Sequence, residues 1–294
     1  MAVSDQVLPS GVAARELSES DLAAAMALSQ EAGWNQTAAD WRLFLELGHV
    51  VGLTRSSGAL IATAATLPHG GGFGWISMVL VTASERRRGL ARWLLRRCMD
   101  DLIAKKLVPV LDATPAGRMV YLGLGFNDCW AMRRAVAQQV RSSSQRGAQE
   151  GATIRPIAEE DWSAIIALDT DVFGADRSRL LRRLAARLPA AALVAERHGR
   201  VVGFLLGRDG RTMNQLGPLA AGDESVAGAL LSHALHTISA PLAIDLPDRH
   251  SRLGEWLSTL GFKIERPLTR MVYGRSHAFD DTARLFAIAG PELG

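Results

Sequence analysis

The chain has 294 residues, 48% of them hydrophobic, so it is long and apolar enough for about two domains with buried cores. Its 33 Lys and Arg residues against 30 Asp and Glu residues leave a formal net charge of only +3. A nucleic-acid-binding protein would be expected to have a broader basic excess, so this charge argues against that class. Two cysteines, Cys98 and Cys129, are too few for a disulfide scaffold or a four-cysteine zinc site and fit a reducing compartment.

No targeting or membrane segment is expected. The first ten residues hold no basic stretch followed by an apolar one, and no apolar run approaches the ~18 residues that a membrane span needs. The seven histidines show no metal-ligand spacing beside a carboxylate cluster. We therefore expect a cytoplasmic protein with no membrane partner and no bound metal.

The first half is predicted to begin with a strand and two helices and to continue as a sheet. Ser18 can cap the first helix, with Asp21 three residues later as in a capping box. The glycines at 70–72 suit a tight hairpin turn. The predicted elements in chain order are a strand over 12–16, a helix after Ser18, a helix over about 37–47, strands over 49–54, 59–67 and 74–82, a helix over about 88–106, a strand over 108–112, a helix near 116–123 and a strand near 128–136.

A small, polar, Gly/Ser-rich segment at 141–152 predicts a flexible linker between two domains, 11–140 and 153–290. The second half matches the first in its predicted elements, with strands over 152–156, 191–197, 200–207 and 212–220 and a helix over about 176–187. The matched residues are Arg15, Glu19, Asp21, Ala27 and Leu28 with Arg155, Glu159, Asp161, Ala167 and Leu168, then 109–112 with 241–245, and 125–126 with 261–262. This order of matches indicates a tandem duplication of a mixed α/β sheet with helices on both faces.

The chemistry is expected where the predicted strand 74–82 turns into the helix near 88. Three arginines, Arg86 to Arg88, are followed by Gly89 and Ala91. A helix N-terminus leaves backbone N–H groups without partners and favours anions, while it disfavours each cation by ~0.3–1 kcal/mol. Clustered arginines there indicate a phosphorylated ligand, such as a pyrophosphate, over 86–91 rather than a solvated basic helix start.

Two motifs resemble those of the Gcn5-related N-acetyltransferases (GNAT). Residues 81–91, Val-x-x-x-x-Arg-x-x-Gly-Leu-Ala, are similar to the acetyl-CoA signature of that family, and residues 121–126, Tyr-Leu-Gly-Leu-Gly-Phe, to its Tyr-x-x-x-Gly-Phe segment. The resemblance covers 11–136 well and extends weakly over 153–275. It implies an α/β (α+β) fold with a mixed, mostly antiparallel sheet flanked by helices, the acyl-CoA N-acyltransferase fold, duplicated in tandem.

The resemblance also implies residue roles. Backbone N–H groups of about 86–91 would bind the CoA pyrophosphate, and the strand edge at 79–81 would pair with the pantetheine amides. Tyr121 would protonate the departing CoA thiolate, a buried core tyrosine being the alternative. The residues implied to bind acetyl-CoA are Val79, Leu80, Val81, Arg86, Arg87, Arg88, Gly89, Leu90, Ala91 and Thr114, the last standing where many relatives have an asparagine.

The implied reaction is the direct attack of a primary amine, expected to belong to a small molecule, on the acetyl carbonyl of acetyl-CoA in a ternary complex. Many relatives carry a glutamate on the strand before the arginine-rich turn, where this chain has Ser77 and Met78. Asp112, His69 or a chain of waters is left as the general base. The two cysteines are expected to be packing residues, not nucleophiles.

The second half departs from the motif. Asp223 and Glu224 stand where the first half has arginines, and Leu257 where it has Tyr121. We expect this half to bind no CoA and to be non-catalytic, because acidic residues cap a helix and repel phosphate. Asp245 and Asp248 either attract an amine or are solvated loop acids.

Two other functions stay open. The missing strand carboxylate mildly favours a non-catalytic acyl-CoA-binding or ligand-sensing module. Five arginines between 177 and 187 are expected to form a solvated helix face, and a nucleic-acid adaptor that uses this face is opposed by the near-balanced charge. We therefore expect no nucleic-acid partner, and a homodimer is left open.

Overall fold

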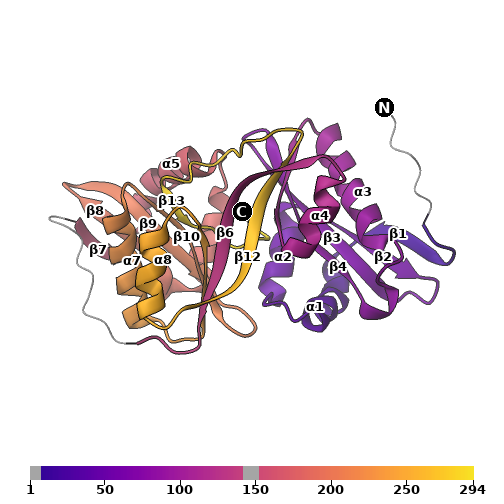
Figure 1. Ribbon diagram of the computed structural model, residues 1–294, viewed down its shortest axis with the longest axis horizontal. Coiled ribbons are helices and arrows are strands. Elements are labelled where there is room, and N and C mark those ends of the chain that lie inside the picture. Colours follow the sequence, from indigo (N-terminus) through magenta and orange to yellow (C-terminus); the bar gives the residue numbers. More distant parts are fainter. Residues whose placement is uncertain (1–7, 142–151) are drawn as a thin grey trace. The chain divides into compact units, whose positions relative to one another are not determined.

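The computed structural model describes residues 8–141 and 152–294, and Figure 1 shows its strands and helices. All but the two end residues of the predicted linker at 141–152 therefore lie outside the described residues. Within the described ranges, no helix is both long and apolar enough to cross a membrane.

The chain packs into two compact units that are not its two sequence halves. The first unit holds Met1–Pro68 and Phe73–Val110, and the second holds His69–Gly72 and Leu111–Gly294. The predicted domains 11–140 and 153–290 thus remain a division of the sequence, and the reason that packing divides the chain elsewhere lies in the second unit.

The first unit is a sheet with strands in the order β1-β2-β3-β4-β5. β1 pairs antiparallel with β2, and β2 with β3, whereas β4 pairs in parallel with the start of β5. The elements are β1 (Val12–Glu16), α1 (Leu22–Glu31), α2 (Ala38–Leu47), β2 (His49–Arg55), β3 (Leu60–His69), β4 (Phe73–Val81), α3 (Leu90–Ala104) and β5 (Val108–Ala113). The last residue of β3, His69, and the second half of β5, which includes Asp112, belong to the second unit.

Local sequence explains how these helices begin. The predicted capping box is present, with the Ser18 backbone N–H donating to Asp21 at 2.9 Å, but it closes a 3-10 turn over Glu19–Asp21 and α1 follows at Leu22. α3 begins at Leu90, two residues later than predicted, because Gly89 caps it in a left-handed conformation. The apolar stripe of α3 is buried as its spacing predicts, at Leu90, Leu94, Cys98 and Leu102.

The matched residues of the two halves form the same ion pair. In the first unit Arg15 Nη1 lies 2.8 Å from Asp21 Oδ2, and in the second Arg155 Nη1 lies 2.6 Å from Asp161 Oδ2. Each pair ties the first strand of its half to the turn that starts the following helix. The repeat seen in the sequence is therefore a repeated structural contact.

The second unit is a sheet with strands in the order β12-β6-β11-β10-β9-β8-β7, to which β13 adds by pairing with β10. β10 and β11 are parallel, and the other pairs with a described register are antiparallel. The elements are α4 (Pro115–Leu122), β6 (Phe126–Ala137), β7 (Ala152–Pro156), α5 (Trp162–Phe173), α6 (Ser178–Arg187), β8 (Leu193–Arg197), β9 (Arg200–Arg208), β10 (Asn214–Ala221), α7 (Glu224–Thr237), β11 (Leu242–Pro247), α8 (Ser251–Thr259), β12 (Lys263–Tyr273) and β13 (Leu285–Ala287).

β6, the last strand of the first sequence half, lies between β11 and β12 of the second half. Figure 1 shows β6 (magenta) beside β12 (yellow), and the register pairs Ala135 with both Ile264 and Ile244. Because β6 leaves its own half to complete the other half's sheet, its contacts are made within that sheet. This exchange explains why the compact units do not divide at the predicted linker.

Two buried ion pairs at equivalent positions accompany the exchange. Arg134 of β6 pairs with Asp245 of β11 at 2.7 Å, and Arg270 of β12 pairs with Asp112 of β5 at 2.8 Å. Arg270 also pairs with Asp280 and lies over the ring of Trp130. In each pair the aspartate and the arginine come from different sequence halves.

We predict that Arg270→Met lowers the free energy of unfolding by about 3–5 kcal/mol, because it leaves the buried carboxylates of Asp112 and Asp280 without a cation. Urea denaturation of the whole chain measures this. Arg15→Met, which breaks a solvent-exposed pair, is the control and is expected to cost under about 1 kcal/mol. Similar small losses for both variants would show that the buried pairs stabilise the fold no more than an exposed pair does.

Candidate functional site

The turn between β4 and α3, residues 82–89, has an unusual backbone. Arg86 is extended, and both Arg87 and Gly89 have left-handed conformations, with φ of +60° and +80°, while Arg88 between them does not. Backbone that alternates in hand in this way turns successive N–H groups to one side and forms a concave nest for an anion. Arg87 is not glycine, so its conformation is a strained feature of the kind that gathers at functional sites.

The donors of this nest are unused. Within the described part of the chain, the backbone N–H groups of Arg87, Arg88 and Gly89 donate no hydrogen bond. The N–H of Trp93 donates to the carbonyl of Gly89 at 3.0 Å, so the donors before it at the start of α3 have no intrahelical acceptor. A Cβ at Gly89 would meet nothing within 4 Å, so the turn is open to a ligand on this side.

The three arginines of the turn divide into two groups. Arg88 Nη1 lies 2.6 Å from Glu85 Oε2, and the same carboxylate accepts a hydrogen bond from Arg55 Nε at 2.9 Å. These bonds, with that of Arg55 foremost, hold the pKa of Glu85 below its ordinary value, so the carboxylate stays ionised. Arg86 and Arg87 are exposed and carry no ion pair that the described residues show, although Arg86 Nε donates a hydrogen bond to the Val81 carbonyl at 3.2 Å. They are the cations that the turn offers to an anionic ligand.

β4 carries a feature that sequence reasoning missed. Buried Met78 has a left-handed backbone, with φ of +53°, and its carbonyl accepts a hydrogen bond from the Thr63 hydroxyl at 2.9 Å. This interrupts the regular strand immediately before Val79 to Val81, of which Leu80 is buried and the two valines are partly exposed. The sequence could not predict this left-handed backbone at Met78, because methionine does not favour that conformation.

Thr114 and Tyr121 belong to the second unit. The Thr114 hydroxyl accepts a hydrogen bond from the Gly117 N–H at 3.2 Å and caps α4, with Pro115 at the first helical position. This gives Thr114 a structural role, and its contact with a cofactor stays a prediction.

Tyr121 is a half-buried residue of α4 whose ring centroid lies 6.1 Å from that of Phe126. Its hydroxyl makes no hydrogen bond with any described residue. Burial raises the pKa of Tyr121, so the phenol keeps its proton at neutral pH. A protonated, uncommitted hydroxyl is what a proton donor requires.

Neither side chain proposed as the general base is available. Both carboxylate oxygens of Asp112 accept hydrogen bonds from Arg270 at 2.8 Å in the buried pair described above. His69 is buried against Phe173, and burial together with the charge of Arg177 lowers its pKa to about 3. Of the three alternatives drawn from the sequence, the chain of waters is left.

The second half closes the position that the first half leaves open. β10 and α7 are joined by only two residues, Gly222 and Asp223, in place of an eight-residue turn. Asp223 Oδ1 accepts a hydrogen bond from the Val226 N–H at 2.9 Å and so caps α7 itself. Leu257, at the position of Tyr121, is a buried core residue.

The edge of β10 that corresponds to 79–81 is also occupied by the chain itself. β13 pairs Ala287 with Leu219 and Leu285 with Ala220, and the N–H of Ala221 donates to the carbonyl of Arg284 at 3.0 Å. The strand edge that a pantetheine arm would need is therefore taken by a protein strand. Sequence reasoning missed β13.

The acids proposed to attract an amine in the second half are both paired. Asp245 is fully buried on β11 and bonds Arg134 and Gln215, so its description as a solvated loop acid is wrong. Asp248 lies 2.8 Å from Arg133 beside a cavity of about 300 Å³.

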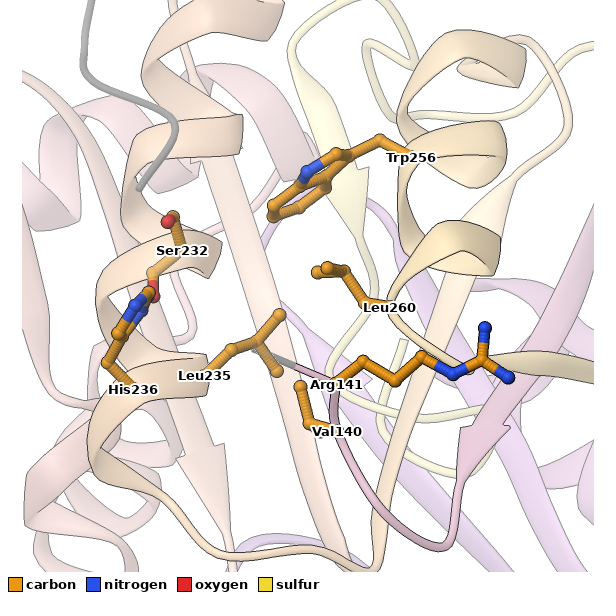
Figure 2. Close-up of a pocket in the computed structure, with 7 residues that line it drawn as sticks. All are labelled: Val140, Arg141, Ser232, Leu235, His236, Trp256 and Leu260. Atoms are coloured by element: carbon orange, nitrogen blue, oxygen red, sulfur yellow. The ribbon is translucent and has the colours of Figure 1, made fainter. Parts of the chain in front are cut away.

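Figure 2 shows the side chains that line a second cavity, among them Trp256 and His236. The volume of this cavity is about 200 Å³. Neither cavity includes a residue of the predicted site.

The arginines between 177 and 187 do not all form a solvated face. Arg177 is buried, bonds Asp169 at 2.9 Å and donates to the carbonyl oxygen of Gly294 at 2.7 Å, so the prediction is wrong for this residue. Arg182 pairs with Glu159 at 2.8 Å, and Arg187 pairs with Asp209 at 2.7 Å. Sequence spacing could not show this, because these acids lie 8, 23 and 22 residues from their arginines and on other elements.

Neither cysteine has the environment of a nucleophile. Burial raises the pKa of Cys98 to about 12 and that of Cys129 to about 11, whereas reactive cysteines have lowered pKa values. Cys98 is a packing residue of α3, as predicted, and Cys129 is partly exposed on β6.

The mixed sheet, the duplicated elements and the open turn before α3 define an acyltransferase class, and comparison with known proteins agrees. Residues 16–126 match a family model described as the acetyltransferase (GNAT) family, and residues 165–287 match one described as an acetyltransferase (GNAT) domain. The chain belongs to the GNAT acetyltransferases and carries two such domains in tandem. It is an N-acetyltransferase, and the predicted fold class is confirmed.

Several known proteins are similar to this chain over nearly their whole lengths. YitH of Bacillus subtilis, an uncharacterized N-acetyltransferase, is 24% identical over 281 residues, which cover 95% of this chain and 97% of YitH. A solved Pyrococcus horikoshii protein assigned as an acetyltransferase has a TM-score of 0.78 at 18% identity, covering 100% of this chain and 99% of its own. A tandem GNAT protein from the clavulanic acid biosynthesis pathway has a TM-score of 0.64 at 13% identity, covering 89% and 98%.

We predict that Arg86→Glu weakens binding of CoA, used as a pyrophosphate-bearing probe, by about 100-fold or more, because a carboxylate then faces the phosphate. Isothermal titration calorimetry measures this. Lys105→Glu, the same charge reversal just past the far end of α3, is the control and should leave affinity within about threefold.

Arg88→Ala should change CoA affinity little, because its guanidinium is bound to Glu85. A loss as large as that of Arg86→Glu would instead place Arg88 on the phosphate.

Proposed function

We propose that the chain transfers the acetyl group of acetyl-CoA to the primary amine of a small molecule, by direct attack in a ternary complex. The observation that carries this proposal is the turn at 86–91, where left-handed backbone, unused N–H donors and two exposed arginines coincide. The pyrophosphate of a CoA thioester has the charge that such a nest binds.

The proposed cofactor contacts follow from this turn. Backbone N–H groups from Arg87 to Ala91 hold the pyrophosphate, and the guanidinium groups of Arg86 and Arg87 neutralise it. The partly exposed edge at Val79 and Val81 pairs with the pantetheine amides in the manner of an added strand.

The proposed reaction balances without a covalent enzyme intermediate. The lone pair of the neutral amine forms the C–N bond, and the carbonyl electron pair moves onto oxygen. When it returns, the C–S bond breaks and its electrons leave on sulfur, which takes a proton from the Tyr121 hydroxyl. The amine loses its extra proton to water, and water returns a proton to the Tyr121 phenolate. Asp112 does not take the amine proton because it is paired with Arg270, and His69 does not because its pKa is lowered to about 3. The raised pKa of Tyr121 supports this role, because the group stays protonated until the thiolate forms.

A small-molecule acceptor is proposed over a nucleic acid for an electrostatic reason. The arginine run at 177–187 is partly neutralised by Asp169, Glu159 and Asp209, and the net charge is only +3. The surface therefore offers no broad basic field to a polyanion.

The decisive test is a calorimetric titration of the whole chain with acetyl-CoA. We expect one site per chain, since the second half caps its own helix with Asp223 and fills the edge of β10 with β13. Two sites would contradict the assignment of the second half, and no binding would refute the proposed function. A panel of small amines, peptide N-termini and lysine peptides, assayed by thiol release, then tests the acceptor class.

We predict that Tyr121→Phe lowers kcat by about 100-fold or more, since general acid catalysis typically contributes 10²–10⁴, while the Kd for acetyl-CoA changes less than about twofold. Steady-state thiol release with the best amine of the panel measures kcat. Tyr273→Phe removes the other tyrosine hydroxyl of the chain and is the matched control, with kcat expected to be unchanged. Full turnover in Tyr121→Phe would exclude this residue as the proton donor.

A further inference from the structure

The last residue of α1, Glu31, contacts the start of the phosphate-binding turn. One carboxylate oxygen accepts a hydrogen bond from the Thr82 hydroxyl at 2.8 Å, and the other accepts one from the backbone N–H of Ala83 at 2.6 Å. These contacts span 51 and 52 residues of sequence. Glu31 is exposed, so no burial requirement explains why its carboxylate lies there.

The position of Glu31 is unfavourable for its own helix. The C-terminal end of a helix carries partial negative charge and favours a cation, yet the last turn of α1 holds no basic residue and ends on a glutamate. A residue that opposes its local element and bonds a distant one is better explained by the distant contact. Its bonds to Ala83 and Thr82, and then the charge of Arg86, lower the pKa of Glu31 below its ordinary value, so it is ionised at neutral pH.

Glu31 is one of two carboxylates that hold the turn. Glu31 bonds its beginning at Thr82 and Ala83, and Glu85 bonds Arg55 and Arg88 further along. Arg86 and Arg87, the two cations exposed to a ligand, lie between the points where Arg88 and Ala83 are held. A site whose loop is held before the ligand arrives spends less binding free energy on ordering it.

We infer that Glu31 is a positioning residue for the cofactor loop: it holds Thr82 and Ala83 so that the donors of Arg87 to Ala91 are preorganised for the pyrophosphate. The inference rests on the proposed function, because it takes acetyl-CoA as the ligand of the turn. The oxygen atoms of Glu31 carry the effect, and its charge opposes it slightly, since a second anion near Arg86 repels phosphate.

Three substitutions separate the effect of the hydrogen-bonding oxygen atoms of Glu31 from the effect of its charge. Glu31→Ala removes the acceptor, and the KM for acetyl-CoA should rise about fivefold to tenfold with kcat and the amine KM unchanged within twofold. Glu31→Asp is too short to keep both bonds and should fall between. Glu31→Gln keeps an oxygen for the Ala83 N–H and removes the charge, so its KM should equal that of the unaltered chain or be lower.

A second readout needs no cofactor. Arg86 and Arg87 are exposed trypsin sites within the turn, and cleavage there depends on how often the turn opens. We expect cleavage at these residues to be several-fold faster in Glu31→Ala and unchanged in Glu31→Gln. Glu19→Ala removes another exposed carboxylate of the first half, one that pairs with Arg42 at 2.7 Å, and is the matched control for both measurements.

The outcomes distinguish this inference from the proposed function. If the unaltered chain binds acetyl-CoA and Glu31→Ala binds it equally well, with no change in cleavage, the inference is wrong and the function stands. Tighter binding by Glu31→Ala would also overturn it, since Glu31 would then compete with the phosphate for the turn. If the unaltered chain binds no acetyl-CoA, the proposed function fails, and the inference fails with it.

Discussion

The packing of the second unit depends on buried arginine–aspartate pairs between strands that come from different halves of the sequence. Arg134 and Asp245 join β6 to β11, and Arg270 joins β12 to Asp112. A buried charge without its partner is costly, so each pair favours the register in which β6 lies between β11 and β12. Because of this exchange, the sheet of the second unit is complete only when strands from both sequence halves are in place.

The duplication left two versions of one connection, from a strand to the helix that follows it. In the first half the connection is an eight-residue turn with left-handed Arg87 and Gly89 and unused donors. In the second it is two residues long, and the carboxylate of Asp223 satisfies the helix N-terminus that an anion would otherwise bind. β13 then covers the adjacent strand edge. One fold thus presents an open helix N-terminus in one half and a capped one in the other.

Three adjacent arginines in a turn repel one another unless counter-charges are present, and counter-charges in the wrong place would block an anionic ligand. The structure separates these roles. Glu85 pairs with Arg88 and Arg55. Glu31 accepts hydrogen bonds from the Ala83 N–H and the Thr82 hydroxyl at the beginning of the turn. Arg86 and Arg87 stay exposed. The number of arginines in the motif therefore overstates the number that can face a phosphate.

Much of the fold and part of the site could be predicted from the sequence alone, because local rules carry them. Apolar periodicity located α3, the predicted capping box of Ser18 and Asp21 is present before α1, and the spacing of Arg15 and Asp21 against Arg155 and Asp161 indicated the tandem repeat. Only the tertiary structure decided which side chains were already engaged: Arg88 by Glu85, Arg177 by Asp169 and the Gly294 carbonyl, and Asp112 by Arg270, 158 residues away. It also decided the strand exchange, the left-handed Met78 and the cover on β10. Sequence patterns report the preferences of neighbouring residues, whereas a charge in the folded chain is matched by whichever partner the packing brings near it.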